Sequence, residues 1–315
     1  MPRLSILIPW LGLPQQFEGT LVSVLQNRPA DCEVVLAHVP EYDDPYGLGD
    51  ELRLIHAPQQ RSVIGLINEA LPQLQGEIIH LLGCGIEVTE HWTAPALAHF
   101  HDPEVAAVSP LVQTAAGSQA GVALTSDGRR RVILADSTSD IASLEAQISG
   151  PTLDAGFYHR DVLLALEGFD ERVGDAYADL DLGLAISDLG LRTVVEPSLP
   201  LALSESGSQR LRGLSAGAAA ERFYRRHAAR CSSGSATRLL WALASDAAYL
   251  PTLEAFTRPL GRLLAWFETD PSQRHADRVA AAATTLEQVA AQTFSLDAAR
   301  EQQSANRGDA QRRAA

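Results

Sequence analysis

The 315-residue chain contains no lysine and only three cysteines. All 25 of its basic residues are arginines, and 39 acidic residues outweigh them to give a net charge of −14. A protein face that binds a nucleic-acid backbone needs an excess of positive charge, so this balance argues against a nucleic-acid partner. Cys32, Cys84 and Cys231 are far apart and odd in number. This pattern indicates neither a metal cluster nor a disulfide framework, and it favours a reducing compartment.

Long hydrophobic runs are also missing. The stretch Leu239–Phe267 is apolar, but four charged side chains, among them Asp246 and Arg258, interrupt it. A membrane-spanning helix needs about 20 nearly uncharged residues. The apolar run at the N-terminus is too short for a signal peptide. We therefore expect no membrane span and a cytoplasmic location.

Apolar strands and amphipathic helices alternate in the first third of the chain. Leu4–Ile8 and Glu33–Ala37 are short apolar runs typical of buried parallel strands, and Phe17–Gln26 between them has its apolar residues at helical spacing. A second strand, helix and strand are predicted at Leu52–His56, Val63–Leu74 and Ile78–Leu82. Repeated strand–helix–strand units are typical of a doubly wound α/β fold with a mostly parallel sheet. Further along, Gly121–Leu134 alternates around Ser126-Asp127-Gly128, which predicts a hairpin.

A sharp break follows the strand predicted at Ile78–Leu82. Gly83-Cys84-Gly85 ends this strand at once. In open α/β sheets, ligands bind just outside the carboxyl ends of the strands. The sequence therefore predicts a binding site at this break.

The segment around the break resembles one in family 2 glycosyltransferases. Gly76–Trp92 reads GEIIHLLGCGIEVTEHW, and in that family the corresponding strand ends in Asp-x-Asp, whose carboxylates hold a divalent metal against the diphosphate of a nucleotide-sugar. Here Gly83 and Gly85 occupy both carboxylate positions. The resemblance also includes SILIPW, TLVSVLQNRPADCEVVLAH and SVIGLINEAL in the first half of the chain.

A second stretch, Asp154–Pro197, resembles the acceptor half of the same family. Gly168-Phe169-Asp170-Glu171 is similar to its Gly-Phe-Asp-Glu, and Ala178-Asp179-Leu180-Asp181-Leu182 to its Glu-Asp-x-Asp-Leu. The ordered set of motifs spans Pro2–Leu203. It implies a GT-A-like domain over residues 1–204, with a nucleotide half at 1–110 and an acceptor half at 111–204.

The resemblance implies that Asp179 is the catalytic base that deprotonates the acceptor hydroxyl. Ala178 replaces the usual glutamate beside it. The alternative is that Asp179 caps a helix N-terminus, because aspartates precede an apolar-periodic run here. Asp181 lies two residues on, about 200° around a helix, and is assigned to donor binding.

The resemblance also implies the donor-binding residues, which are Pro9, Trp10, His38, Arg61, Asn68, Gly83, Gly85 and Asp181. Trp10 either stacks on a base or fills the pocket. His38 either bonds a base edge or is a strand-end histidine with a backbone partner. Arginine can clamp a diphosphate without metal, and Arg61 or the Arg225-Arg226-His227 run could do so. For all of these residues, a solvated helix face is the favoured interpretation.

The usual metal ligands are absent together. Besides the Asp-x-Asp pair, the family often has a histidine shortly after the strand that matches Thr193–Pro197, and here Leu201-Ala202-Leu203-Ser204 follows. Cys84 is a poor ligand for hard cations. We therefore predict that no divalent metal binds at this site.

The rest of the chain is predicted to be a helical extension over residues 205–300. A loop is expected at 204–208, a basic amphipathic helix at Glu221–Arg230, a break at Cys231–Ser235, and helices over Ala236–Thr293 divided at Pro251, Pro259 and Pro271. Residues 301–315 have no apolar face, which predicts a disordered tail.

Two functional hypotheses follow. In the first, the protein moves a sugar from a nucleotide-diphospho-sugar to a glycan or other hydroxyl acceptor without a metal. In the second, it is a catalytically degenerate relative that binds a glycan, a nucleotide or a protein. The sequence leaves the donor sugar, the acceptor and the oligomeric state open.

Overall fold

The structure is a computed structural model that describes residues 3–12, 14–39, 47–136, 139–203, 213–231, 235–249, 252–268 and 272–291. The loop predicted at 204–208 and the tail predicted at 301–315 lie outside these residues. The predicted domain boundary at 204 therefore stays a prediction.

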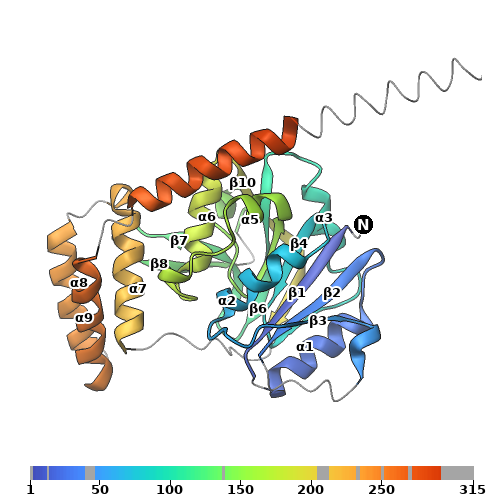
Figure 1. The fold of residues 1–315 in the computed structure, drawn as a ribbon, viewed down its shortest axis with the longest axis horizontal. Helices are drawn as coiled ribbons and strands as arrows, with labels where there is room; N and C mark the ends of the chain where they lie inside the picture. The colour runs from blue at the N-terminus through green and yellow to red at the C-terminus, as the bar shows by residue number, and fades with distance from the viewer. Residues whose placement is uncertain are drawn as a thin grey trace, which may run out of the picture.

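A single mixed sheet forms the centre of the described chain (Figure 1). Its main path is β3 (Arg53–His56), β2 (Cys32–His38), β1 (Leu4–Trp10), β4 (Ile78–Leu82), β9 (Ala155–His159), β6 (Val105–Thr114), β10 (Arg192–Leu203) and the two-residue β5 (Ile86–Glu87). The first four strands are parallel, and β9 runs antiparallel between β4 and β6. β6 and β10 are parallel to each other. The predicted α/β fold with a mostly parallel sheet is confirmed, and β4 lies in its middle.

Helices cover both faces of this sheet because successive strand residues point to opposite sides. Ile6 and Ile8 of β1 pack with Phe17 of α1 (Pro14–Gln26) on one face. Leu7 points to the other face and joins the cluster formed by α2 and α6. The helices within residues 47–203 are α2 (Val63–Ala70), α3 (Ala94–His99), α4 (Ile141–Gln147), α5 (Arg160–Ala165) and α6 (Ala178–Asp188). Short 3-10 helices occur at Leu48–Asp50, Leu71–Gln73, Glu171–Val173 and Ala228–Arg230.

The predicted hairpin consists of β7 (Gly117–Leu124) and β8 (Arg130–Ala135), which extend the sheet from β6. Gly128 in its turn has φ +81°, and a Cβ there would lie 2.5 Å from the Tyr224 ring. Only glycine lets the turn approach α7 (Gly213–Arg226) this closely. The hairpin tip is therefore held against the C-terminal helices.

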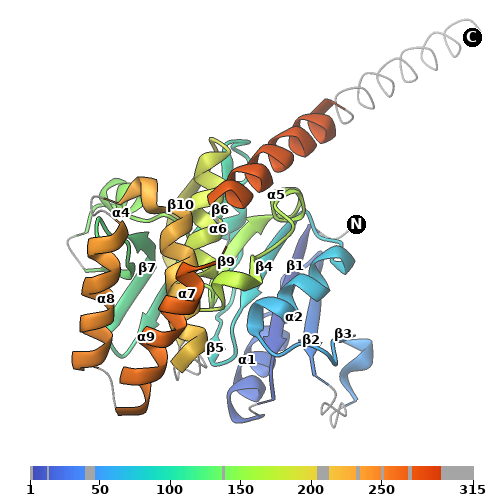
Figure 2. The same cartoon turned by 60° about the vertical axis from the view of Figure 1, so that its left-hand side comes forward.

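The C-terminal helices lie at the end of the sheet away from β1–β3 (Figure 1). They are α7, α8 (Ser235–Tyr249), α9 (Thr252–Trp266) and a further helix at 272–291. In both views this last helix crosses over α5 and α6 (Figures 1 and 2). Gly217 and Gly261 bring α7 and α9 together, since a Cβ at either would lie about 2 Å from a carbonyl oxygen of the partner helix. None of the described helices is long and apolar enough to cross a membrane.

Several predicted boundaries are wrong. β1 continues through Pro9 to Trp10, because β4 pairs with β1 only at Leu4–Leu7 and needs no N–H from Pro9. α7 starts at Gly213 rather than Glu221. Pro259 lies inside α9 and does not end it. A proline removes one helical hydrogen bond, and close packing against α7 holds α9 continuous here.

Candidate functional site

The carboxyl end of β4 meets a partly buried aspartate, Asp154, that the sequence analysis did not single out. The Gly83 N–H donates to the Asp154 carbonyl oxygen at 2.7 Å. A Cβ on Gly83 would lie 3.3 Å from both Cα and Cβ of Asp154. Asp154 therefore borders the space that a side chain at position 83 would enter. Burial, and then the charge of Asp179, raises the pKa of Asp154, which favours its neutral form.

Asp179, the predicted base, is fully buried in the first turn of α6 and is bound by Arg130 at the start of β8. Arg130 Nε donates to Asp179 Oδ1 at 2.9 Å, and its Nη2 donates to Oδ2 at 2.5 Å. The backbone N–H groups of Leu180 and Leu153 donate to Oδ1 and Oδ2 at 2.7 and 3.1 Å. The helix N-cap is Tyr177, so Asp179 is not the cap residue, although it lies in the first turn and its carboxylate accepts from the Leu180 N–H there.

These contacts saturate the Asp179 carboxylate. An ionised carboxylate has about four lone-pair sites, and four donors fill them here. Asp179 can take a proton from an acceptor hydroxyl only after one of these donors moves away. Arg130 is the donor able to do so, because its side chain is 25% exposed while Asp179 is enclosed.

A cavity of about 530 Å³ lies on the open side of this ion pair. Arg130 and Tyr177 line it on the side of the sheet, and residues of α8 and α9, including Arg238, Trp241 and Arg262, line it on the other. Arg130 therefore lies between the cavity and the predicted base, Asp179. The sequence analysis did not identify Arg130, which lies in the predicted hairpin Gly121–Leu134. Three consecutive arginines, Arg129-Arg130-Arg131, are the sequence feature that could have indicated a charged site there.

The predicted donor-binding residues at the ends of β1 and β2 are buried and packed. Trp10 is 7% exposed and stacks on Phe17 with ring centroids 5.1 Å apart, which favours the pocket-filling interpretation. His38 Nδ1 lies 2.7 Å from the Val39 carbonyl oxygen, and its ring stacks on His56. His38 therefore has the backbone partner that the second of the two interpretations requires.

The loops beside these residues are tied to one another. The Cys84 thiol donates to the Pro9 carbonyl oxygen at 3.4 Å, and the Gly85 N–H donates to Thr20 Oγ1 at 2.8 Å. Pro9, Gly83 and Gly85 thus lie at the same edge of the sheet, as predicted. Their role in donor binding stays a prediction.

Arg61 and Asn68 have other partners. Arg61 is exposed and donates to the Pro58 and Gln60 carbonyl oxygens. Asn68 exchanges two 2.8 Å hydrogen bonds with the Phe169 backbone, which fixes the turn of the Gly-Phe-Asp-Glu motif. Their assignment to the donor also stays a prediction.

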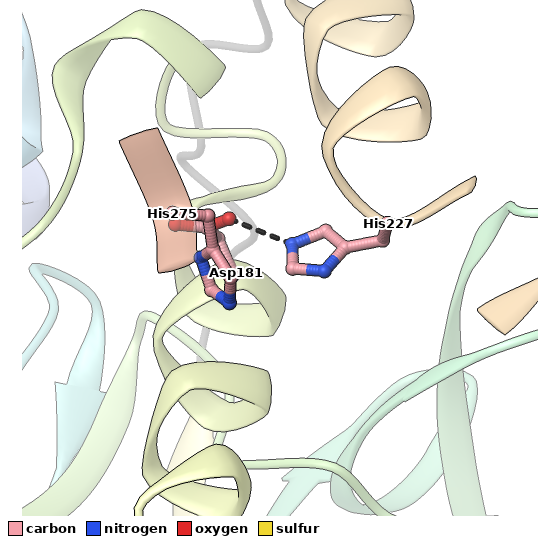
Figure 3. Close-up of side chains that lie close together, drawn as sticks. All are labelled: Asp181, His227 and His275. Carbon is pink, nitrogen blue, oxygen red and sulfur yellow. Dashed lines mark hydrogen bonds and ion pairs between the residues drawn. The ribbon is translucent and has the colours of Figure 1, made fainter. Parts of the chain in front are cut away.

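Asp181 has different partners from Asp179 and anchors the C-terminal helices. Figure 3 shows its contact with His227. It accepts from Arg226 at 2.8 Å and from Arg278 at 3.4 Å, and His227 Nε2 lies 2.8 Å from its Oδ1. Although burial opposes ionisation, the His227 hydrogen bond and the Arg226 charge hold the pKa of Asp181 far below its usual range. The solvated-face interpretation of Arg226 and His227 is therefore wrong, since both are buried.

Two places could be considered for a divalent metal, and neither fits. Asp181, His227 and His275 place ligand atoms within 4.8 Å of one another (Figure 3), but the two guanidinium groups already on Asp181 would repel a cation. At the end of β4, the side chains beside the two glycines are Cys84 and Asp154. Burial raises the pKa of the Cys84 thiol to about 12 and also raises the pKa of the Asp154 carboxyl. Hard cations need ionised oxygen ligands, so this pair does not favour one.

Comparisons with known proteins agree with this architecture. No protein-family model and no curated protein sequence matches the chain. A structure of GalNAc-T7 with UDP, GalNAc and Mn²⁺ is 12% identical with a TM-score of 0.59, covering 89% of this chain and 56% of its own. The Pyrobaculum calidifontis mannosyltransferase PcManGT, in complex with GDP-Man and Mn²⁺, is 18% identical with a TM-score of 0.51. The match covers 90% of this chain and 86% of PcManGT. S. aureus TarS is 13% identical with a TM-score of 0.51, and the match covers 77% of this chain and 42% of TarS.

The protein therefore has a GT-A-like glycosyltransferase fold. It spans about half the length of GalNAc-T7 and TarS.

Proposed function

We propose that the protein is a family 2-type glycosyltransferase that moves a sugar from a nucleotide-diphospho-sugar to a hydroxyl group of a glycan or other acceptor, without a divalent metal. The observation that carries this proposal is the buried Asp179 carboxylate at the carboxyl edge of the sheet, linked by Arg130 to a cavity. A carboxylate so placed can act as a general base once its guanidinium partner shifts.

In this reaction Asp179 takes the proton of the acceptor hydroxyl. The oxygen forms a bond to the anomeric carbon of the donor sugar, and the bond from that carbon to the diphosphate breaks. Arg130 decides when Asp179 is available, because it occupies both carboxylate oxygens in the structure. The GalNAc-T7 and PcManGT structures contain UDP and GDP-Man, which supports a nucleotide-sugar donor. The predicted cytoplasmic location stays a prediction.

A second candidate is a glycosyltransferase-fold protein that binds a ligand without turnover. The saturation of Asp179 favours it, and so does the packing of Trp10 against Phe17 where a nucleotide base is expected. In this case the Arg130–Asp179 pair would be a permanent structural contact.

One experiment tests the proposal against this alternative. The purified protein is incubated with a panel of UDP- and GDP-sugars, once in chelator and once in manganese, and release of the nucleoside diphosphate is measured with and without hydroxyl acceptors. Calorimetry with UDP and GDP runs in parallel. The proposal predicts acceptor-stimulated release. Binding without release supports the binding module, and release that requires manganese contradicts the metal-free mechanism.

A further inference from the structure

The cavity beside Asp179 carries positive charge in a chain whose net charge is −14. Five arginines line it, namely Arg129, Arg130, Arg238, Arg258 and Arg262. Four carboxylates pair with them, which are Asp127, Asp179, Glu221 and Asp246. The neighbouring Asp154 has a raised pKa. Among the residues whose side chains the structure describes, five guanidinium groups thus share four carboxylates.

The excess charge lies on α8 and α9, where three arginines share two carboxylates. Arg238 Nη2 lies 2.8 Å from Glu221 Oε2, and Arg262 binds Asp246 Oδ2 at 2.6 Å. Arg262 also reaches Glu221 at 3.5 Å. Arg258 Nε is 3.6 Å from Asp246 Oδ1, which is too far for a hydrogen bond. Arg258 is therefore the arginine with the weakest pairing.

Two buried donors of this cluster have no hydrogen-bond partner within the described part of the chain, although the Arg238 guanidinium also stacks on the Tyr224 ring, 3.3 Å from its centroid. They are the Nε–H groups of Arg238 and Arg258. The Arg238 side chain is only 10% exposed, and burial, with the charge of Arg262 adding to it, lowers the pKa of its guanidinium. Buried polar groups are normally hydrogen-bonded, so these donors point to an anionic ligand.

Aromatic side chains complete the same cavity. Tyr177 lines its inner side, and Trp241, 66% exposed, lies at its mouth. Aromatic rings offer flat apolar surfaces with a polar edge, which suits the apolar face of a sugar ring. A volume of about 530 Å³ lies within the range of small-molecule sites.

We propose that this cavity binds an anionic sugar, a monosaccharide-sized ring that carries one carboxylate or phosphate group. The anion pairs with Arg258 and Arg238, and the ring lies against Trp241. That this sugar is the acceptor rests on the proposed function. Because Arg130 lines the cavity and also holds Asp179, a sugar bound there brings its hydroxyl groups close to the predicted base.

Equilibrium binding without any donor tests this inference. Calorimetry at low salt compares glucuronate, glucose 6-phosphate and the neutral glucose on the full chain. We expect at least one anionic sugar to bind about tenfold or more tightly than glucose, since charge-assisted hydrogen bonds to guanidinium are strong. Whether glucuronate or glucose 6-phosphate binds more tightly identifies the anionic group.

Variants assign the binding to this cavity. Arg258→Gln removes one guanidinium, and Asp246, its ion-pair partner among the described side chains, still binds Arg262. The fold should therefore survive, and anion affinity should fall about tenfold. Arg192→Gln is the matched control, because Arg192 is half-exposed, pairs with Asp102 and lies on β10 outside the cavity lining. Trp241→Ala should lower the affinity for anionic sugars and for glucose by the same factor.

Equal affinity for glucose and both anionic sugars would overturn the inference, as would equal effects of Arg258→Gln and Arg192→Gln. The outcome is separable from that of the proposed function. Anion-selective binding without sugar transfer would contradict the transferase and leave this site standing. Sugar transfer to neutral acceptors, without selective binding of anionic sugars, would support the transferase and contradict this site.

Discussion

Arg130 and Asp179 bind each other through two parallel hydrogen bonds, one to each carboxylate oxygen. Arg130 begins β8 and Asp179 lies in the first turn of α6, 49 residues later. One partner is enclosed, and the other lines a cavity. Together they connect solvent to the carboxylate that the fold places at the edge of the central sheet.

The strength of this pair can be measured with Arg130→Gln, Asp179→Asn and the double variant. Removing one partner of a buried pair leaves the other charge buried without a counter-ion. Each single change should therefore lower the free energy of unfolding by about 3–5 kcal/mol. The double variant should cost less than the sum, with a coupling of about 1–3 kcal/mol. Urea unfolding gives these values. The exposed pair Arg192–Asp102 is the control, and an equally small coupling at both pairs would contradict this prediction.

His80 gives a prediction for acid stability. It is buried in β4 and stacks on Phe157 with ring centroids 3.7 Å apart, and burial lowers its pKa to about 3. The unfolded chain protonates His80 near pH 6.5 and the folded chain does not, so the unfolded state binds more protons between these values. The free energy of unfolding should therefore fall by up to about 1.4 kcal/mol per pH unit from pH 6.5 down to 3.

His80→Phe should flatten this dependence, because phenylalanine keeps the stack and cannot protonate. Urea unfolding between pH 4 and 7 measures the slope for each protein. His101→Phe serves as control, since His101 is exposed, and it should keep the slope. Identical slopes for the original chain and His80→Phe would show that His80 is not kept neutral by burial.

The metal-free mechanism predicts that divalent ions leave nucleotide binding unchanged. Gly83 and Gly85 have no side-chain ligands, and the partly buried Cys84 thiol donates to the Pro9 carbonyl oxygen. Calorimetric titration of UDP and GDP in manganese and then in chelator should give equal affinities. A gain of tenfold or more with manganese would show that other residues supply the ligands.

Much of the sheet was predictable because its signals are local. Ile78–Leu82 forms β4 as predicted, and the Ser126-Asp127-Gly128 turn joins β7 to β8. Pairings between distant segments carry no such signal. The antiparallel insertion of β9 between β4 and β6 depends on contacts that no local pattern encodes.

The candidate site divides in the same way. Asp179 was found because its motif is contiguous, but the partners that determine its chemistry come from elsewhere. Arg130 comes from β8. Asp154 directly precedes β9 and contacts Gly83 at the end of β4. Arg226 looked like a surface arginine in the sequence, yet its partner Asp181 lies 45 residues away. Only the tertiary structure brings such charges together.

The most direct test of the account is the turnover of Asp179→Asn in chelator, measured with the donor and acceptor that give release with the original chain. Asparagine keeps the shape of the side chain but cannot take the proton, so turnover should fall by about 10²–10⁴-fold. Circular dichroism at the assay temperature must show the variant folded, and Asp161→Asn, on the partly exposed α5, should keep full turnover. A folded Asp179→Asn protein with unchanged turnover would contradict the claim that Asp179 is the base.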